Sequence, residues 1–349
     1  EHIKKLAWLP LDWGVNNSLR KIGVPAGYIS VLTAELLYEW NDLDRALPFL
    51  LEGLNEAEEE NCLEVFIPAL ITLARIKRAR GSLEGALKAV EKGCRKVRET
   101  KYKQWLPLLS AFKVQLLLSR GEREECQRWK ENNHLSIYGR LIPARELEYF
   151  TLARVLMDQG NYEDALVLLA RLHLLAEREG RLYTMIDIFN LQSLAYFEQG
   201  ETQKAMEALE KSLLLAEPLG YLRKFIDQGR PMLSLLVKFL PWQKKYTSNK
   251  KEVSSCFVQK LIRKTREGII LWSGKEKHRD IFSFSGEKLT RRELEVLRFL
   301  DQELSNVEIS CRLAIALPTV KAHISSIFSK LGVNNRAAAA KQAREMDIL

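Results

Sequence analysis

The residues best placed to do chemistry lie in the stretch ALPTVKAHISSIFSKLG, residues 316–332. Its apolar residues recur at the spacing of a helix with one buried side, namely Val320, Ile324, Ile327, Phe328 and Leu331. The opposite side carries short side chains and one cation, namely Lys321, Ala322, Ser325 and Ser329. A helix that enters the major groove of DNA, about 12 Å wide, needs short outward side chains and a few donors. The pattern therefore indicates a DNA-reading helix.

Two further helices should support this one. TRRE (290–293) and SNVE (305–308) both match the capping box, in which Ser or Thr covers the third amide and Glu reaches back to the cap residue. The four residues 314–317 then separate the second helix from the reading helix, which is the turn length of a helix-turn-helix. We therefore predict a small helical domain over 284–349.

The motifs LTRRELEVL, LSNVEI and TVKAHISSIFSKLGVNNR closely resemble the LuxR-type, or NarL-type, DNA-binding domain. Several elements agree at fixed offsets across four helices, so the resemblance is specific, and it covers about 60 residues. It implies contact with base edges or phosphates for Thr290, Arg291, Ser305, Asn306, Thr319, Val320, Lys321, Ala322, Ser325 and Lys330.

The last helix, 335–346, is expected to pair with that of a second copy when two copies bind DNA half-sites. The residues that this implies at the dimer contact are Asn335, Ala338, Ala339 and Gln342. The small residues of this helix are equally compatible with a plain helix surface. The resemblance also implies double-stranded promoter DNA and RNA polymerase as partners.

The sequence departs from the family at three positions. Ala316 stands where the family has a Ser or Thr cap, a loss that typically costs about 1 kcal/mol. Ser326 replaces an asparagine of the reading helix, and Glu303 replaces a glycine. Ala316, the following Pro318, and Ser326 keep open an alternative, in which the chain is a helical-repeat interaction scaffold with a degenerate helix-turn-helix.

Upstream, the sequence repeats itself every 39 or 40 residues. NDLDRA, GSLEGA, GEREEC, GNYEDA and GETQKA begin at residues 41, 81, 121, 160 and 200. Each places Asn or Gly, which can end a helix, five residues ahead of a small residue that lets two helices approach. The third repeat is off pattern at Val114, Cys126 and Lys130. We predict an all-α solenoid of five helical hairpins over 1–237, loosened at the third.

These repeats resemble tetratricopeptide-like repeats and, together with GYLRKFIDQGRPM (220–232), the helical region of MalT-like regulators of the LuxR family. That resemblance implies a sensor of an unknown small-molecule or protein effector. MalT-like regulators carry a nucleotide-binding domain ahead of the repeats. This chain begins at Glu1 rather than Met and has no GxxxxGK[ST] motif, so any such domain would lie before Glu1.

The formal net charge of +9 is concentrated between the two domains. Residues 238–279 hold 12 Lys and Arg against 3 Asp and Glu. We predict a basic linker over 238–283 with one short helix around 253–265. The linker either adds attraction to DNA phosphates or is simply a solvated connection.

The composition and the absence of certain motifs argue against a membrane protein, a disulfide-linked protein and an enzyme. No apolar run is long enough for a membrane span, and five cysteines without a CxxC pair favour a reducing, cytoplasmic setting. HExxH, GxSxG and paired catalytic carboxylates are absent, and His134 and His173 stand alone. We therefore expect no enzyme activity, catalytic residue, cofactor or metal.

Overall fold

The computed structural model describes residues 25–246, 252–273, 291–302, 304–313, 315–331, 333 and 335–345. The chain divides into two units, Glu1–Phe282, called the repeat unit, and Ser283–Leu349, called the C-terminal unit. The described residues form helices and contain no strand, so the all-α prediction is confirmed. None of the described helices is long and apolar enough to cross a bilayer.

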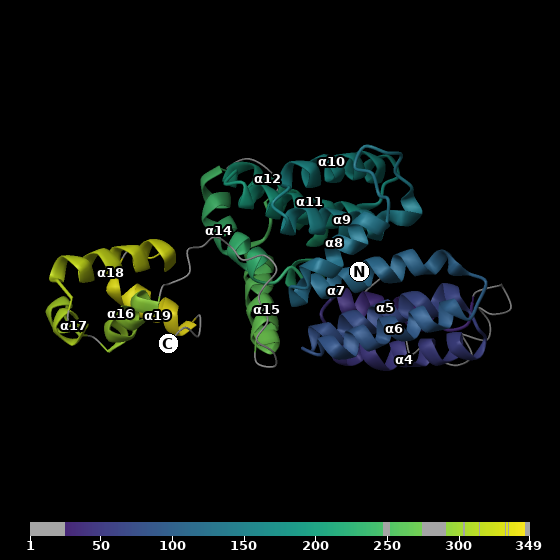
Figure 1. The fold of residues 1–349 in the computed structure, drawn as a ribbon, viewed down its shortest axis with the longest axis horizontal. Helices are drawn as coiled ribbons and strands as arrows, with labels where there is room; N and C mark the ends of the chain where they lie inside the picture. Colours follow the sequence, from purple (N-terminus) through teal and green to yellow (C-terminus); the bar gives the residue numbers. More distant parts are fainter. Residues whose placement is uncertain are drawn as a thin grey trace. The chain divides into compact units, whose positions relative to one another are not determined.

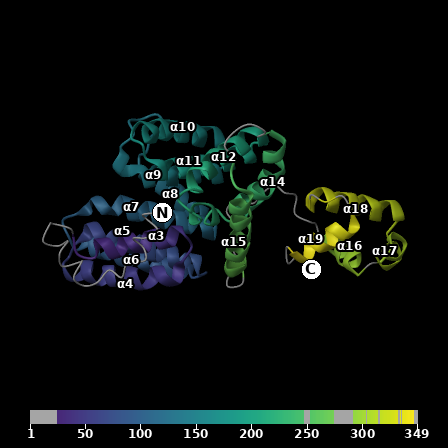
Figure 2. The ribbon, with the colours of Figure 1, turned by 180° about the vertical axis from the view of Figure 1, so that it is seen from behind.

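Five helical hairpins follow one another in the repeat unit, as the repeat predicts (Figures 1 and 2). Their first helices are α3 (Tyr28–Glu39), α5 (Leu63–Ala79), α7 (Leu106–Arg120), α9 (Glu146–Asp158) and α11 (Leu182–Glu198). Their second helices are α4 (Leu43–Glu59), α6 (Leu83–Arg98), α8 (Arg123–Asn132), α10 (Tyr162–Arg178) and α12 (Thr202–Ala216). Short 3₁₀ helices, η1 (Lys103–Trp105) and η2 (Pro143–Arg145), precede α7 and α9.

Each hairpin turns at the residue that the repeat marks. The five turn residues all have a left-handed backbone, with φ between 62° and 80°: Asn41, Gly81, Gly121, Gly160 and Gly200. In the first turn, Asn41 N donates to Tyr38 O (2.8 Å) and Asp42 N donates to Leu37 O (2.9 Å), and the same pair of bonds recurs at the other four turns. This is the Schellman arrangement, which satisfies the last carbonyls of a helix.

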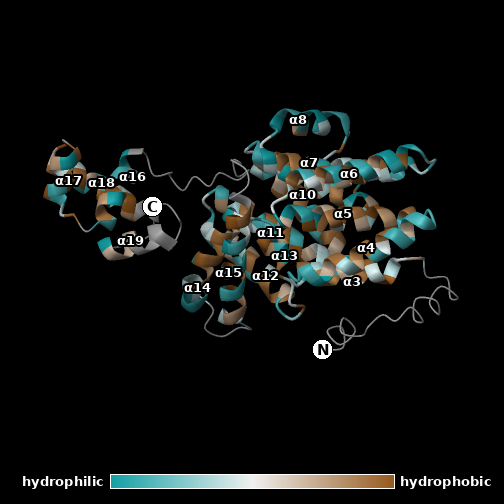
Figure 3. Cartoon of the chain, turned by 90° about the horizontal axis from the view of Figure 1, so that it is seen from below, coloured by the Kyte–Doolittle hydropathy of each residue, from teal (hydrophilic) through white to brown (hydrophobic). Residues whose placement is uncertain are grey.

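Small residues lie where the two helices of a hairpin cross, and they are buried. On the first helices these are Ala34, Ala74, Ala153 and Ser193, and the larger Val114 is buried at the same place in the third hairpin. On the second helices they are Ala46, Ala86, Cys126, Ala165 and Ala205. The hydropathy colours of Figure 3 place the apolar residues mainly where helices face one another.

The third hairpin, whose sequence departs from the repeat, has the shortest second helix of the five. Its second helix α8 ends at Asn132, and an irregular segment, 133–142, follows it before η2. The carbonyls of this segment find a partner in Arg171, which donates to Ile137 O and Gly139 O. The core divides here into two clusters, because α7 faces one with Leu109 and Phe112 and the other with its opposite side.

Three more helices continue the repeat unit beyond the hairpins. They are α13 (Arg223–Ile226), α14 (Arg230–Tyr246) and α15 (Ser255–Ser273). Much of the segment expected to be a basic linker from residue 238 is therefore folded. Its apolar residues Phe239, Val253, Phe257, Val258 and Leu261 are buried in the core of the last repeats. The correction has a simple cause, since these residues recur at helical spacing between the lysines.

The C-terminal unit has four described helices around its own core. They are α16 (Arg291–Asp301), α17 (Asn306–Leu313), α18 (Leu317–Leu331) and α19 (Arg336–Glu345). Val296 and Leu297 of α16, Ile309 of α17 and Ile327 of α18 are fully buried together. The short connection before α18 matches the turn expected of a helix-turn-helix.

Candidate DNA-reading helix and repeat-unit cavity

Helix α18 presents one polar face and one buried face. Lys321, Ala322 and Ser325 are exposed, and Thr319 is exposed in the first turn. On the other side, Val320 and Ile327 are 0% exposed. Val320 was expected among the residues that contact DNA, but its side chain belongs to the core and supports the helix from within. Among the described residues of the exposed face, Lys321 has the one long side chain and the others are short, as a groove-entering helix requires.

The start of α18 lacks a side-chain cap. The carbonyl of Ala316 accepts from Thr319 N (2.9 Å) and Val320 N (3.2 Å), which makes Ala316 the residue before the helix. Its methyl group cannot accept from a backbone amide. Pro318 lies in the first turn, where its missing N–H leaves one fewer donor without a partner.

Ser326 faces the inside of the C-terminal unit. Its hydroxyl donates to Glu293 Oε1 at 2.7 Å, and Glu293 is only 3% exposed. The bond joins α18 to the start of α16. Ser326, which stands where the family has an asparagine, therefore helps to orient α18. It does not lie on the outer face of the helix.

The capping box predicted at SNVE is formed. Glu308 N donates to Ser305 Oγ (3.3 Å), and Ser305 N donates to Glu308 Oε2 (2.7 Å). The hydrogen bonds from Ser305 hold the pKa of the Glu308 carboxyl below its usual range. Ser305 is exposed and Asn306 is partly exposed, so both can still reach a phosphate.

Some predicted residues lie outside what the structure describes. Thr290, with the first capping box, is one of these, and the side chains of Arg291, Lys330 and Gln342 are others.

Helix α19 uses two of its predicted dimer residues within the unit. Asn335 Oδ1 accepts from Ala338 N at 2.8 Å and caps the helix. Ala339 is fully buried against the core, so it is not available to a second copy. Its burial follows from the helical spacing, which turns Ala339 and Ala340 of the row inward. Ala338 remains partly exposed.

In the repeat unit, the row of hairpins closes on itself. Residues 219–228, after the fifth hairpin, contact the first hairpin about 180 residues earlier. Leu222 N donates to Glu39 O (2.7 Å), Trp40 Nε1 donates to Leu219 O (3.0 Å), and the Tyr38 hydroxyl donates to Asp227 Oδ2. We call these bonds the closing contact.

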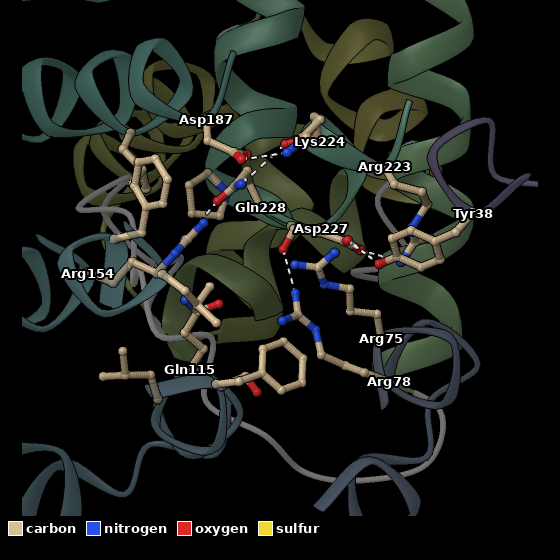
Figure 4. Close-up of a pocket in the computed structure, with 18 of the residues that line it drawn as sticks. Tyr38, Arg75, Arg78, Gln115, Arg154, Asp187, Arg223, Lys224, Asp227 and Gln228 are labelled. Carbon is tan, nitrogen blue, oxygen red and sulfur yellow. Dashed lines mark hydrogen bonds and ion pairs between the residues drawn. The ribbon is translucent and has the colours of Figure 1, made fainter. Parts of the chain in front are cut away.

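A cavity of about 210 Å³ lies inside the closed row, and Figure 4 shows its polar lining. It is lined from α3, α5, α7, α9, α11 and the segment after the fifth hairpin. Its apolar lining includes Phe112, Leu147 and Phe150. Its charged lining residues are Glu39, Arg75, Arg78, Arg154, Asp187, Arg223, Lys224, Asp227 and Arg230.

The carboxylates of the cavity are already engaged. Lys224 Nζ pairs with Asp187, and Arg223 pairs with Asp227. Arg78 donates to the backbone oxygen of Asp227 at 2.7 Å. The carboxyl of Glu39 accepts from the Tyr183 hydroxyl at 2.7 Å, and burial raises its pKa despite the opposing charge of Lys224.

The sequence offered no direct signal for this cavity. Its charged residues belong to different repeats, but Arg75 and Arg154 occupy the same place in theirs, since TLAR occurs at both 72–75 and 151–154. The nearest signal was the segment GYLRKFIDQGRPM, which carries Arg223, Lys224, Asp227 and Gln228 and follows the last repeat. The isolated histidine His173 packs against Phe189, with ring centroids 5.0 Å apart, as a packing residue would.

Two family models match this chain. The one described as "MalT-like TPR region" matches residues 19–241, and the one described as "Bacterial regulatory proteins, luxR family" matches residues 287–343.

Similar proteins include several named HTH-type transcriptional regulator MalT. That of Serratia proteamaculans is 23% identical over 346 residues. Those of Vibrio campbellii and Vibrio parahaemolyticus are each 24% identical over 334 residues. Each match covers 90% of this chain and 35% of the relative, so the chain spans about a third of the length of these relatives.

Proposed function

Since this chain belongs to the MalT-like TPR family and carries a LuxR-family DNA-binding domain, we propose that it is a sequence-specific transcription regulator. Its α18 reads promoter DNA, and its helical repeats sense a ligand or a protein partner. The observation that carries the proposal is the exposed face of α18, where Lys321, Ala322 and Ser325 project from a helix anchored by Val320 and Ile327.

The chemistry of that face suits the major groove. Lys321 can donate to O6 and N7 of guanine, and Ser325 can donate to or accept from a base edge. Ala322 leaves room for close approach and can contact a thymine methyl group. Short residues here let the backbone of α18 lie near the bases, and so the few donors reach them.

Phosphate contacts would fix the register of α18. Ser305 and Asn306 at the start of α17, and Thr319 at the start of α18, combine side-chain donors with helix N-termini, which favour anions. We extend the same role to Thr290, Arg291 and Lys330. Two copies on half-sites one DNA turn apart, with RNA polymerase as a further partner, complete the proposed assembly, and the exposed part of Ala338 is the α19 surface open to such pairing.

The proposal is tested by removing Lys321. The chain is first used to select duplexes from a random pool, and the selected duplex is then titrated by fluorescence anisotropy at fixed low salt. Lys321→Ala should weaken binding by about 1–3 kcal/mol and relax the preference at one base pair if Lys321 meets a guanine. An equal loss for every duplex, with a smaller salt dependence, would identify a phosphate contact instead.

Lys88→Ala is the matched control. Lys88 is exposed on α6 of the repeat unit, and its replacement removes the same charge without touching α18. Its binding should equal that of the unmodified chain. If no duplex is retained at low salt, or if the two variants bind equally, α18 is not a DNA reader, and the interaction-scaffold alternative takes its place.

A further inference from the structure

We propose that the cavity of the repeat unit binds a compact organic anion, a carboxylate or phosphate monoester, whose charged group is held by Arg75 and Arg154. This inference rests on the proposed role of the repeats as a sensor and names the class of ligand. It is drawn from the charges that line the cavity and from the donors among them that have no acceptor.

Cations outnumber carboxylates in the lining. Among the residues that line the cavity are six Arg or Lys and three Asp or Glu. Two of the three carboxylates, Asp187 and Asp227, pair with Lys224 and Arg223. The third, Glu39, has a raised pKa because it is buried, so its negative charge is disfavoured. An anion bound in the cavity would therefore face more cations than carboxylates among the lining residues.

Arg154 carries part of that excess. Its Nη1 donates to the neutral amide oxygen of Gln228 at 2.9 Å, and its Nε is buried without a partner. Burial and the nearby charge of Arg78 lower its pKa to about 10, although Asp187 opposes this effect. Figure 4 shows Arg154 and Arg78 reaching toward the same space from different helices. An anion there would accept from the guanidinium of Arg154 and offset the repulsion between the two guanidinium groups.

Arg75 supplies a second set of donors. Its guanidinium lies over the ring of Phe112, 5.8 Å from the centroid. Within the part of the chain that the structure describes, it makes no hydrogen bond or salt bridge, although its pKa is raised despite its burial because the carboxyls of Glu39 and Glu35 lie nearby. The planar fork of an arginine matches the two oxygens of a carboxylate or phosphate. Arg75 on α5 and Arg154 on α9 can therefore bind one anion from two hairpins.

The size and the apolar lining restrict the rest of the ligand. A volume of about 210 Å³ equals that of roughly seven water molecules at ~30 Å³ each, which excludes a folded partner. Phe112, Leu147 and Phe150 offer apolar surface beside the arginines. The occupant should thus be small, with an apolar or aromatic part next to its charged group.

Such a ligand would also stabilise the closing contact. Gln228, the partner of Arg154, lies one residue beyond Asp227, which accepts from Tyr38. A ligand bound to Arg154 is therefore linked through Gln228 to the closing contact, which joins the first hairpin to the segment after the fifth. If the ligand binds only when the closing contact is formed, binding would raise the fraction of molecules in which that contact is formed.

Phenyl phosphate and benzyl alcohol test the ligand class, because the two share an aromatic ring and differ in charge. Each is titrated by calorimetry into the complete 349-residue chain without DNA. We expect phenyl phosphate to bind and benzyl alcohol to bind at least about tenfold more weakly. Arg154→Gln and Arg75→Gln should each weaken phenyl phosphate binding by about 10-fold to 100-fold, the effect of losing one hydrogen bond to a charged group.

Arg178→Gln is the matched control. Arg178 is exposed at the end of α10, and the change removes one guanidinium without touching the cavity. Its affinity for phenyl phosphate should be unchanged. Circular dichroism checks the fold of each variant, and Arg75→Gln provides the test if Arg154→Gln does not fold.

Two results would overturn the inference. One is binding of benzyl alcohol as tight as that of phenyl phosphate, which would leave a sensor of neutral ligands. The other is phenyl phosphate binding that is absent, or that both cavity variants retain in full. Neither result bears on DNA binding by α18, which is measured separately, so the two proposals can fail independently.

Discussion

Ser325 and Ser326 are neighbours on α18 with opposite surroundings. Ser325 is exposed, whereas Ser326 donates to the buried carboxylate of Glu293. In an α-helix, each residue is rotated by about 100° from the one before it, so neighbouring side chains point in different directions. One serine is therefore available to DNA, and the other holds the helix in place.

Replacement of these two serines by alanine should separate stability from DNA binding. Ser326→Ala removes a donor from a buried carboxylate and should lower the free energy of unfolding of the C-terminal unit by about 1–3 kcal/mol. Ser325→Ala should change it by less than about 0.5 kcal/mol but weaken DNA binding. Urea unfolding and anisotropy titrations measure the two effects. Equal stability of both variants would contradict the role assigned to Ser326.

Glu39 should make the stability of the repeat unit depend on pH. Burial raises the pKa of its carboxyl above the ordinary range, so the folded chain binds this proton more tightly than the unfolded chain. Its contribution to stability is then complete below the unfolded pKa and is lost as pH rises through the folded pKa. Glu39→Gln replaces the carboxyl with an amide that does not titrate, so the variant lacks this pH-dependent contribution.

The measurement compares urea unfolding of the unmodified chain and of Glu39→Gln at several pH values. The stability of the unmodified chain relative to the variant should fall as pH rises from below about 4 toward neutrality. If the difference in stability between the two chains stays constant or grows with pH, burial does not disfavour the charged form of Glu39.

At the scale of the element, α18 is a helix held from one side and left without a cap at its start. Burial of Val320 and Ile327 in the core stabilises α18 although its first turn has no side-chain cap. Helix stability in proteins comes mainly from packing of the apolar face, so one absent cap need not prevent the helix. The departure at Ala316 therefore lowers the stability of α18 without removing its exposed face.

Ala316→Ser should restore the cap. A serine hydroxyl at this position can accept from the amide of Thr319, which already donates to the carbonyl of Ala316. The free energy of unfolding of the C-terminal unit should rise by about 1 kcal/mol. Ala322→Ser, on the exposed face of the same helix, is the control and should give no gain. The cap assignment fails if both variants have the same unfolding midpoint.

At the scale of the whole repeat unit, five similar hairpins close because the accumulated rotation brings the segment 219–228 to the first hairpin. Side chains of the first hairpin, among them Tyr38 and Trp40, make this contact. An open solenoid would leave these groups in water. Residues of the closing contact line one side of the cavity, and the contact joins the two ends of the row.

Tyr38→Phe tests the closing contact. It removes the hydroxyl that donates to Asp227 and should destabilise the repeat unit by about 1–3 kcal/mol, because the partly buried carboxylate loses a donor. Tyr138→Phe is the control, since Tyr138 is 72% exposed, and should change stability by less than about 0.5 kcal/mol. If thermal unfolding gives equal losses, the hydroxyl of Tyr38 does not contribute to closure.

Features that depend on local spacing could be predicted from the sequence. The period of 39 or 40 residues, the turn residues such as Gly81, the small residues such as Ala74, and the capping box at Ser305 all act within one hairpin or one turn. A left-handed turn needs Gly or Asn wherever it occurs, and close helices need small side chains. The inward and outward faces of α18 followed from the same kind of spacing.

Only the tertiary structure decided which distant residues meet. The bond between Ser326 and Glu293, the packing of α15, and the approach of Tyr38 to Asp227 depend on how whole helices are placed. In a solenoid, each hairpin adds a small rotation, and the sum over five hairpins determines whether the ends meet. No local pattern encodes that sum. The sequence shows that Arg75 and Arg154 recur with the repeat, but only the tertiary structure shows that they line one cavity.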